Sequence, residues 1–351
     1  MKTLYIHIGP HKTGTTSLQH VLYEEREHLL AVGVLFPQEG LGSWRSQHRL
    51  AFSLKGIADH KTGDIPDREE EFGSVLREIA ASPADKIIIS AEGFFAIRSE
   101  AIHYLRDIFV NFDVRIVFYA RRQDETFLST YTQQAKNPRS ALVKPIYAYL
   151  DAPESLSPDL DIYGCASKWA AVFGKERLVP RLYAEASDIP SDFMNCVGEG
   201  RLAELVHTAK PRRLNVSQTL EALEYLRAFK EMEPDTSRHA AAQQALFRHF
   251  AATGCPASSL LSTQDKRNVL NHYRTRNEHF FAEYFETDNL FDPDKLLRGE
   301  AIERTQVDTS DAVNLVEKLL AAKSSSPPTS QLRQSLAGRL RDTFFNVINR
   351  G

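Results

Sequence analysis

The sequence predicts an α/β fold: a doubly wound parallel sheet with a helical C-terminal half packed on it. Two observations support this prediction. In the first half of the chain, short apolar runs typical of strands buried on both faces alternate with apolar residues at helical spacing. Beyond about residue 187 the strand-like runs fade and the helical spacing continues. Alternating strands and helices imply parallel strands joined by right-handed crossovers.

Each expected strand is a short apolar run, and the runs lie at residues 3–8, 34–36, 86–90, 114–120 and 178–182. The last run contains Pro180, which cannot donate a ladder hydrogen bond, so we place this strand toward an edge of the sheet. A crossover helix is expected around Leu105, between the third and fourth runs. The segment 37–67 is rich in Gly, Ser, Arg and His, and we expect loop and short helix there.

The composition is that of a soluble globular protein. With 351 residues, of which 42% are hydrophobic and 25% charged, the chain can bury one large core or two modest ones. A formal net charge of -3 gives no general electrostatic case for nucleic acid or an anionic membrane, so any anion site must be local. No apolar stretch approaches the roughly twenty residues that a membrane-spanning helix needs.

The cysteines favour a reducing compartment. Cys165, Cys196 and Cys255 are odd in number and lack the spacing of metal ligands. We therefore expect reduced structural thiols and a cytoplasmic protein.

One domain is expected over residues 1–322, with a helical subregion from about 187 to 322. Residues 323–330, rich in Ser and Pro, form a predicted linker. In the segment 331–351, apolar residues recur every four positions and predict an amphipathic helix; they are Leu332, Leu336, Leu340 and Phe344. Such a helix can dock on the same chain, join the subunits of a homo-oligomer or attach peripherally to a membrane.

The most informative motif follows the first predicted strand. Residues 9–18 have the sequence Gly-Pro-His-Lys-Thr-Gly-Thr-Thr-Ser-Leu and precede a predicted helix. A glycine loop between a strand and a helix offers backbone N–H groups and the positive end of the helix dipole to a phosphate. The candidate binding residues are Gly9, Lys12, Thr13, Gly14, Thr15, Thr16 and Ser17.

This loop resembles a P-loop with one element displaced. In nucleoside triphosphatases a lysine directly follows the second glycine, and a Ser or Thr then holds Mg²⁺. Here Thr15 follows Gly14, and Lys12 precedes it. The displacement argues against ATP with magnesium, and no aspartate pair or Mg²⁺-holding motif in the sequence requires a metal.

A second group of polar residues follows the fourth predicted strand. Arg121 and Arg122 come at its end, and Ser129 lies eight residues after Arg121, inside a helix expected to begin near Asp124. Ligands of open α/β sheets bind at the carboxyl ends of the strands, so Arg121 should lie on the same edge as the glycine loop.

Together the two motifs resemble the sulfotransferases that use 3′-phosphoadenosine 5′-phosphosulfate (PAPS). Residues 9–19 are similar to the phosphosulfate loop of bacterial carbohydrate-type members, and residues 121–133 to a segment of the heparan sulfate glucosaminyl sulfotransferases. The resemblance implies that the 5′-phosphosulfate is bound by Lys12, Gly14, Thr15 and Thr16. It also implies that the 3′-phosphate is held by Arg121, which the eight-residue spacing selects, and by Ser129.

Two looser similarities to the bacterial members extend the resemblance over most of residues 1–292. In the first, Arg213, Asn215 and Ser217 are candidates to reach the nucleotide, although Ser217 is also a natural N-cap for the following helix. The second is the segment 277–291. The sequence shows no leading Golgi anchor like that of the animal enzymes, and Gln123 stands where those enzymes usually have proline.

Sulfuryl transfer needs in-line geometry and stabilisation of charge on the leaving phosphate, a role that suits the Lys12 ammonium. It also needs a base for the hydroxyl proton of the acceptor. Glu92 is one candidate, because it follows the third predicted strand and should emerge at the same edge of the sheet. His48 is the other, because imidazole titrates near neutrality. His7 is expected to be a satisfied core residue. His11 lies in the loop and is left without a role.

The sequence thus predicts a PAPS-dependent sulfotransferase. Its acceptor would be the hydroxyl of a small molecule or glycan, such as a carbohydrate or glycolipid, and its second product adenosine 3′,5′-bisphosphate. No metal and no nucleic-acid partner are expected. Two rivals stay open: a P-loop small-molecule kinase using ATP with Mg²⁺, and a non-catalytic nucleotide-binding protein. The segment 37–67 and the helices after 187 are expected to shape the acceptor pocket.

Overall fold

The computed structural model of the protein describes residues 1–137, 144–186, 188–200, 220–233, 235–253, 260–304 and 307–324. The chain divides into two compact units. Unit 1 consists of Met1–Tyr131, Tyr149–Val216 and Thr263–Ala301. Unit 2 consists of Thr132–Ala148, Ser217–Ser262 and Ile302–Gly351.

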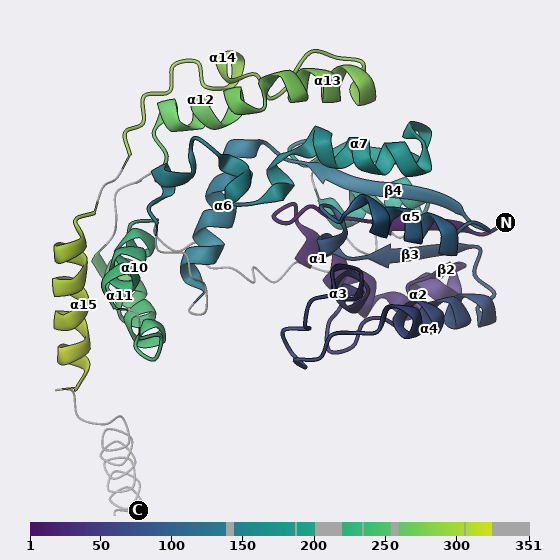
Figure 1. Ribbon diagram of the computed structural model, residues 1–351, viewed down its shortest axis with the longest axis horizontal. Helices are drawn as coiled ribbons and strands as arrows, with labels where there is room; N and C mark the ends of the chain where they lie inside the picture. The colour runs from purple at the N-terminus through teal and green to yellow at the C-terminus, as the bar shows by residue number, and fades with distance from the viewer. Residues whose placement is uncertain are drawn as a thin grey trace, which may run out of the picture. The chain divides into compact units, whose positions relative to one another are not determined.

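Unit 1 is built on a parallel sheet, which in the described residues has five strands in the order β2-β3-β1-β4-β5 (Figure 1). These strands are β1 (Thr3–His7), β2 (Val34–Leu35), β3 (Lys86–Ser90), β4 (Asp113–Ala120) and β5 (Leu178–Leu182). The predicted doubly wound parallel sheet is confirmed, and the Pro180-containing strand lies at an edge. Because β1 is central, its carboxyl end is flanked by those of β3 and β4.

The helices of unit 1 connect and cover these strands. They are α1 (Thr15–Glu24), α2 (Arg26–Ala31), α3 (His48–Lys55), α4 (Arg68–Ala81), α5 (Ser99–Ile108), α7 (Ile162–Phe173), α8 (Ile189–Val197), α12 (Thr263–His272), α13 (Arg274–Phe285) and α14 (Pro293–Leu296). Short 3-10 turns are η1 (Glu92–Phe94), η3 (Pro153–Ser155), η4 (Pro158–Leu160) and η5 (Lys175–Arg177). Helix α6 (Gln123–Lys136) and the turn η2 (Ile146–Tyr149) each cross the boundary between the units.

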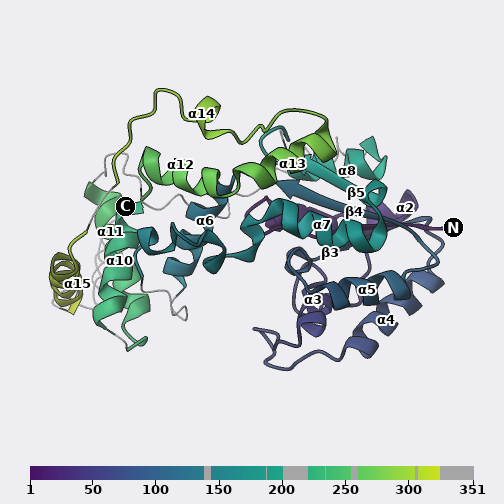
Figure 2. The same cartoon turned by 45° about the horizontal axis from the view of Figure 1, so that its top comes forward.

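Alternation along the strands gives the sheet two buried faces. Ile87 and Ile89 point to one core, which includes Trp169 of α7 and Phe280 of α13, whereas Ile88 points to a second core with Leu22 of α1. Figure 2 shows α7 and α13 side by side on the first face. Covering both faces explains why the strands consist of continuous apolar runs.

Unit 2 has a hydrophobic core of its own. Its helices in the described residues are α10 (Leu220–Met232), α11 (His239–Thr253) and α15 (Thr309–Ser324). Leu226, Phe229, Leu246 and Val316 belong to this core. Of the described helices after residue 187, α8, α12 and α13 contribute buried side chains to the cores of the sheet, as predicted for the helical half of the chain.

The C-terminal predictions are only partly covered. Helix α15 runs to Ser324, two residues into the predicted linker, and the rest of the linker and the predicted helix at 331–351 lie outside the described residues. Among the helices that the structure describes, none combines the length and apolar character needed to cross a bilayer.

Candidate functional site

The loop between β1 and α1 approaches η1 very closely. Gly9 has a φ of +102°, and a Cβ atom placed there would lie 2.9 Å from both the Cα and the carbonyl oxygen of Glu92. Only glycine tolerates both the backbone conformation and this contact. The close approach brings the beginning of the loop and Glu92, the second residue after β3, into one site.

Gly14 joins the loop to α1. It is the N-cap of that helix, has a φ of +77° and supplies no side-chain cap. The first N–H groups of α1 therefore have no capping side chain from this residue, and they lie at the positive end of the helix dipole. Thr16 is exposed and Ser17 half-buried in this first turn. The backbone suits an anionic phosphate or phosphosulfate group.

The loop hydroxyls differ in what they offer a ligand. Thr13 is fully buried and its hydroxyl donates to the Pro10 carbonyl at 2.7 Å, so this hydroxyl closes the loop from within, and binding of a ligand by Thr13 stays a prediction. The Thr15 hydroxyl donates to Glu92 Oε2. Lys12 is half-buried, with a left-handed backbone at φ 70°.

Arg121 lies against the loop, as its position at the end of β4 predicts. Its Nη1 donates to the Lys12 carbonyl at 2.7 Å, its Nε donates to Glu125 Oε2 at 3.0 Å, and its guanidinium lies 4.8 Å from the centre of the Tyr183 ring. Stacking on an aromatic ring and a single loop contact hold the planar group in place. The guanidinium thus stands at the same sheet edge as the loop.

The neighbouring arginine is already neutralised. Arg122 binds the buried carboxylate of Asp124 through Nε at 3.1 Å and Nη2 at 2.7 Å. This bidentate pair holds the start of α6 and leaves Arg121 as the better candidate for a ligand phosphate. Ser129 lies in α6, two turns further on, and is half-buried.

Gln123 pairs with a residue of α13 and fixes the beginning of α6. Gln123 and Asn277 of α13 are both buried, and their amides exchange hydrogen bonds of 2.7 and 3.2 Å. Gln123 is the first residue of α6, so this pair fixes the beginning of the helix that carries Ser129. It also gives the segment 277–291 a positioning role.

Glu92 is the centre of the polar cluster on the other side of the loop. His11 Nδ1 lies 3.0 Å from Glu92 Oε1, and the Thr15 hydroxyl occupies Oε2. The backbone N–H of His11 donates to the buried carboxylate of Asp159, in η4, at 3.1 Å. Both the main chain and the ring of His11 are therefore held by carboxylates.

The charges of this cluster reinforce one another. Burial favours the protonated form of Glu92, but hydrogen bonds from His11 and Thr15 outweigh burial and lower the pKa of Glu92 to about 2. Burial opposes the charged form of His11, yet Glu92 raises the pKa of His11 above its ordinary value. Burial raises the pKa of Asp159. Glu92 is thus an ionised hydrogen-bond acceptor at neutral pH.

His48 begins α3 and is packed rather than hydrogen-bonded through its ring. The ring lies edge-on to Trp44, with centroids 4.9 Å apart, and is stacked on Phe52 at 6.1 Å. Burial lowers the pKa of His48, although the charge of Glu92 opposes this effect. Helix α3 itself packs against η1, because a Cβ atom placed on Gly93 would lie 3.0 Å from the Cβ of Ala51.

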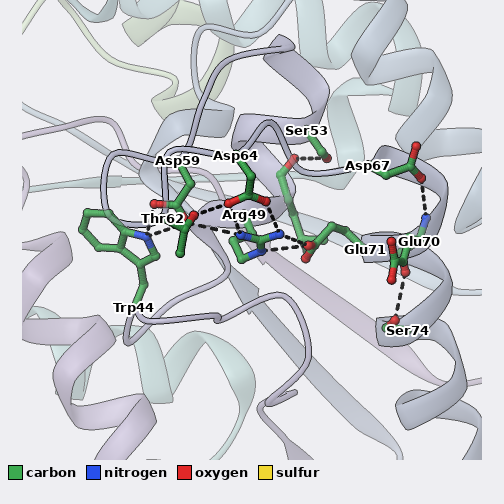
Figure 3. A network of polar contacts seen from close by, with 11 residues as sticks. Trp44, Arg49, Ser53, Asp59, Thr62, Asp64, Asp67, Glu70, Glu71 and Ser74 are labelled. Atoms are coloured by element: carbon green, nitrogen blue, oxygen red, sulfur yellow. Dashed lines mark hydrogen bonds and ion pairs between the residues drawn. The ribbon is translucent and has the colours of Figure 1, made fainter.

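An ion-pair network fixes α3, as Figure 3 shows. Arg49 binds Asp64 at 3.0 Å and Glu71 of α4 at 2.7 Å, and lies 3.5 Å from the fully buried Asp59. The Asp59 carboxylate also accepts from Trp44 Nε1 at 3.1 Å. The network ties the segment 37–67 to α4, and so it holds the aromatic side chains of that segment beside the site.

His7 is only half-satisfied, which corrects its prediction. It is fully buried, and Nδ1 bonds the Ser90 hydroxyl at 2.8 Å, but Nε2 is buried without a hydrogen-bond partner in the described structure. Burial lowers the pKa of His7 to about 4. It is a neutral core residue beneath the loop.

Sequence reasoning missed the partners of the loop. Asp159 and Tyr183 lie in turns without apolar periodicity, so nothing in their local sequence marks them. His11 and Glu92 were both visible in the sequence, but their pairing was not. Three candidates, Arg213, Asn215 and Ser217, lie outside the described residues. Within the residues described, no group of three His, Cys, Asp or Glu side chains is placed to hold a metal ion.

Comparison with known proteins adds little to this site. No protein-family model matches the chain, and no curated protein matches it significantly. Among solved structures, the crystal structure of a sulfotransferase from Alicyclobacillus acidocaldarius is similar, with 14% sequence identity and a TM-score of 0.38 over 70% of this chain and 96% of that chain. A likeness at this level carries no argument about activity, so function must be argued from the site itself.

Proposed function

We propose that the protein is a PAPS-dependent sulfotransferase that transfers a sulfuryl group to a hydroxyl of a carbohydrate or glycolipid acceptor. The observation that carries the proposal is the contact between Arg121 and the Lys12 carbonyl. It joins a phosphate-binding loop and an arginine at one sheet edge, as a ligand with phosphates at two positions requires. A nucleoside triphosphate, with all its phosphates in one chain, does not call for the second position.

The residues divide into three roles. Lys12, Gly14, Thr15 and Thr16 would hold the 5′-phosphosulfate, with the Lys12 ammonium offsetting charge on the leaving phosphate. Arg121 and Ser129 would hold the 3′-phosphate. The aromatic residues of the segment 37–67, Trp44, His48 and Phe52, would line the acceptor side, because aromatic faces suit the apolar faces of sugar rings.

Calorimetry tests the nucleotide assignment directly. Titration with adenosine 3′,5′-bisphosphate should show clear binding, and ATP with Mg²⁺ should bind at least tenfold more weakly. Preference for ATP with Mg²⁺ would favour a kinase and sink the proposal. Transfer of labelled sulfate from PAPS across a panel of sugars and glycolipids then separates an enzyme from a protein that only binds the nucleotide.

A single substitution tests the leaving-group role. Lys12→Ala should lower kcat for sulfate transfer by about 10²- to 10³-fold, the usual loss when one charge-stabilising donor is removed. Circular dichroism checks that the variant folds. Normal kcat in a folded Lys12→Ala protein would remove Lys12 from the mechanism.

A further inference from the structure

The contact between His11 and Glu92 suggests a general base other than Glu92 or His48. We propose that His11 accepts the proton of the acceptor hydroxyl, and that Glu92 is a positioning residue that orients its ring. The inference rests on the proposed function for the identity of the reaction. It was not available from the sequence, where Glu92 and His48 were the candidates.

The two oxygens of Glu92 are both engaged. Oε1 lies 3.0 Å from His11 Nδ1, and Oε2 accepts the Thr15 hydroxyl. Each of these hydrogen bonds stabilises the ionised carboxylate and so makes it a weaker base toward a substrate proton. Glu92 is therefore better placed to hold other groups than to act as the base itself.

The same contact fixes the tautomer of His11. An ionised carboxylate can only accept hydrogen bonds, so Nδ1 must carry the proton that lies toward Glu92. In neutral imidazole the lone pair is then on Nε2, and among the described residues this nitrogen has no hydrogen-bond partner. The His11 side chain is 46% exposed and that of Glu92 21%, so solvent and substrate reach the histidine more readily.

The backbone of His11 is anchored as firmly as its ring. The Asp159 carboxylate accepts its N–H, and Arg121 holds the next carbonyl, that of Lys12. A base on this loop is one residue from the lysine that would stabilise the leaving phosphate. Proton acceptor and leaving-group cation would thus be positioned by the same segment, a simple way to keep their separation constant.

The titratable groups that act on the charge of His11 come from three elements. They are Glu92 of η1, Asp159 of η4, and His48 and Lys55 of α3. The two carboxylates favour imidazolium, whereas Lys55 and burial oppose it. The net effect raises the pKa of His11 above its ordinary value, and the pKa of an efficient base lies near the working pH.

The reaction transfers one sulfuryl group and one proton. The acceptor oxygen forms its bond to sulfur with a lone pair while its proton passes to His11 Nε2. The bond between sulfur and the bridging oxygen breaks, and its electron pair remains on the 5′-phosphate of the leaving adenosine 3′,5′-bisphosphate. Imidazolium, stabilised by Glu92, then releases the proton to solvent.

Nuclear magnetic resonance tests the pair without PAPS. In ¹⁵N-histidine-labelled protein, assigned by comparison with His11→Gln, neutral His11 should be the Nδ1–H tautomer and its pKa should lie above 6.5. Glu92→Gln should lower that pKa. His28 offers a matched control for the effect of a neighbouring glutamate on a histidine ring. Its Nδ1 lies 2.7 Å from Glu25 in an exposed pair at the start of α2. An Nε2–H tautomer of His11 in the wild-type protein would overturn the proposal even if Glu92→Gln did not fold.

Kinetics test the catalytic part. The pH profile of kcat/KM should rise through the measured pKa of His11, and this limb should move to lower pH in Glu92→Gln. His11→Gln should lose the limb and about 10²- to 10⁴-fold in kcat, whereas His28→Gln should keep both. Retention of the limb in His11→Gln would refute the role of His11.

Calorimetry distinguishes failure of the proposed function from failure of the proposed role of His11. His11→Gln should bind adenosine 3′,5′-bisphosphate within about threefold of wild type. If wild-type protein fails to bind this nucleotide, the proposed function fails, while the tautomer and pKa of His11 still decide the structural pair.

Discussion

The cationic side chains at the carboxyl edge of the sheet differ in how far the protein itself has neutralised them. Arg122 is held bidentately by a buried aspartate, and His11 is paired with a glutamate. Arg121 contacts a carbonyl, a half-exposed glutamate and an aromatic ring. Each guanidinium uses two of its five donors in these contacts, but the carboxylate that pairs with Arg122 is buried and the one that pairs with Arg121 is not, so Arg121 keeps more of its charge for a ligand phosphate.

This difference predicts contrasting effects of two neighbouring substitutions. Arg121→Ala should weaken binding of adenosine 3′,5′-bisphosphate about 10- to 100-fold, the value of hydrogen bonds to a charged group. Binding of adenosine 5′-monophosphate, which lacks the 3′-phosphate, should change little. Calorimetry with both nucleotides measures the two effects.

Arg122→Ala is the control for that experiment. It should destabilise the protein, because Asp124 stays buried without its partner, but should leave the ratio of the two nucleotide affinities unchanged. If Arg121→Ala weakened both nucleotides equally, Arg121 would only support the loop.

His7 predicts a pH dependence of stability. Its folded pKa, about 4, lies below its unfolded value near 6.5, so the unfolded state binds more protons between these limits. Stability from this residue is therefore complete above pH 6.5 and is lost as the pH falls toward 4, by about 3 kcal/mol at most. His11 acts in the opposite sense above pH 6.5, because its folded pKa is raised.

Urea unfolding of wild type and His7→Asn across pH 4 to 7 measures this effect. Asn keeps a polar atom for Ser90 but does not titrate, so the difference in unfolding free energy between the two proteins should shrink as the pH falls. A difference that is constant with pH would show that His7 is protonated equally in both states.

At the residue scale, the sequence identified cations better than carboxylates. Lys12 and Arg121 follow strands, and parallel topology alone predicts that such residues share an edge. The bond between Asp159 and the His11 N–H joins positions 148 residues apart through a short 3-10 turn, which leaves no periodic pattern. The half-satisfied state of His7 likewise depends on packing that the sequence does not encode locally.

At the scale of elements, the contact between the loop and η1 is the decisive arrangement. β1 and β3 are hydrogen-bonded neighbours, with His7 opposite Ser90, so the residues that follow them leave the sheet together. The absence of a side chain at Gly9 then allows Glu92 to lie against the loop. The Glu92 cluster and the loop before α1 are thereby built from adjacent strand ends.

Substitution of Gly9 should test this contact. Gly9→Ala introduces a Cβ 2.9 Å from backbone atoms of Glu92, as well as strain at φ +102°. We expect it to destabilise the protein by more than the roughly 1 kcal/mol typical of alanine at positive φ, and to weaken bisphosphate binding at least tenfold. Thermal unfolding and calorimetry measure the two losses.

Gly33→Ala separates strain from contact. Gly33 has a φ of +85°, and a Cβ there would meet no atom within 4 Å. This variant should show the backbone cost alone and bind nucleotide normally. Equal behaviour of the two variants would mean that the approach of Glu92 to the loop is not required.

Apolar runs predicted the bounds of the elements more reliably than they predicted which elements pack against each other. The strands at 86–90 and 178–182 have the predicted bounds, because a strand buried on both faces is a continuous apolar run. Helical spacing around Leu226 indicated that one face of α10 is buried, but not that this face packs with α11 and α15. The spacing of apolar residues identifies the buried face of a helix but not the element that this face packs against.

At the scale of the whole molecule, the separate core of unit 2 predicts separate unfolding. Leu226→Ala should destabilise unit 2 by about 2 to 5 kcal/mol, as is usual for a buried leucine. Trp44 and Trp169, the two tryptophans of the chain, both lie in unit 1, so their fluorescence reports on that unit alone.

The measurement compares two probes of one denaturation. In Leu226→Ala, part of the helical circular dichroism should be lost at lower urea concentration, while the fluorescence transition stays in place. Coincident shifts of both transitions would show that the two units unfold as one.

The hydrogen bonds that hold the loop between β1 and α1 also have a kinetic consequence under the proposed function. Thr13, Arg121, Asp159 and Glu92 each fix a different point of it in the protein without ligand. A segment restrained in this way has little conformational freedom left to lose, so nucleotide capture should be governed by diffusion and charge attraction rather than by slow rearrangement. Discrimination between nucleotides would then appear in their residence times, with the 3′-phosphate slowing escape.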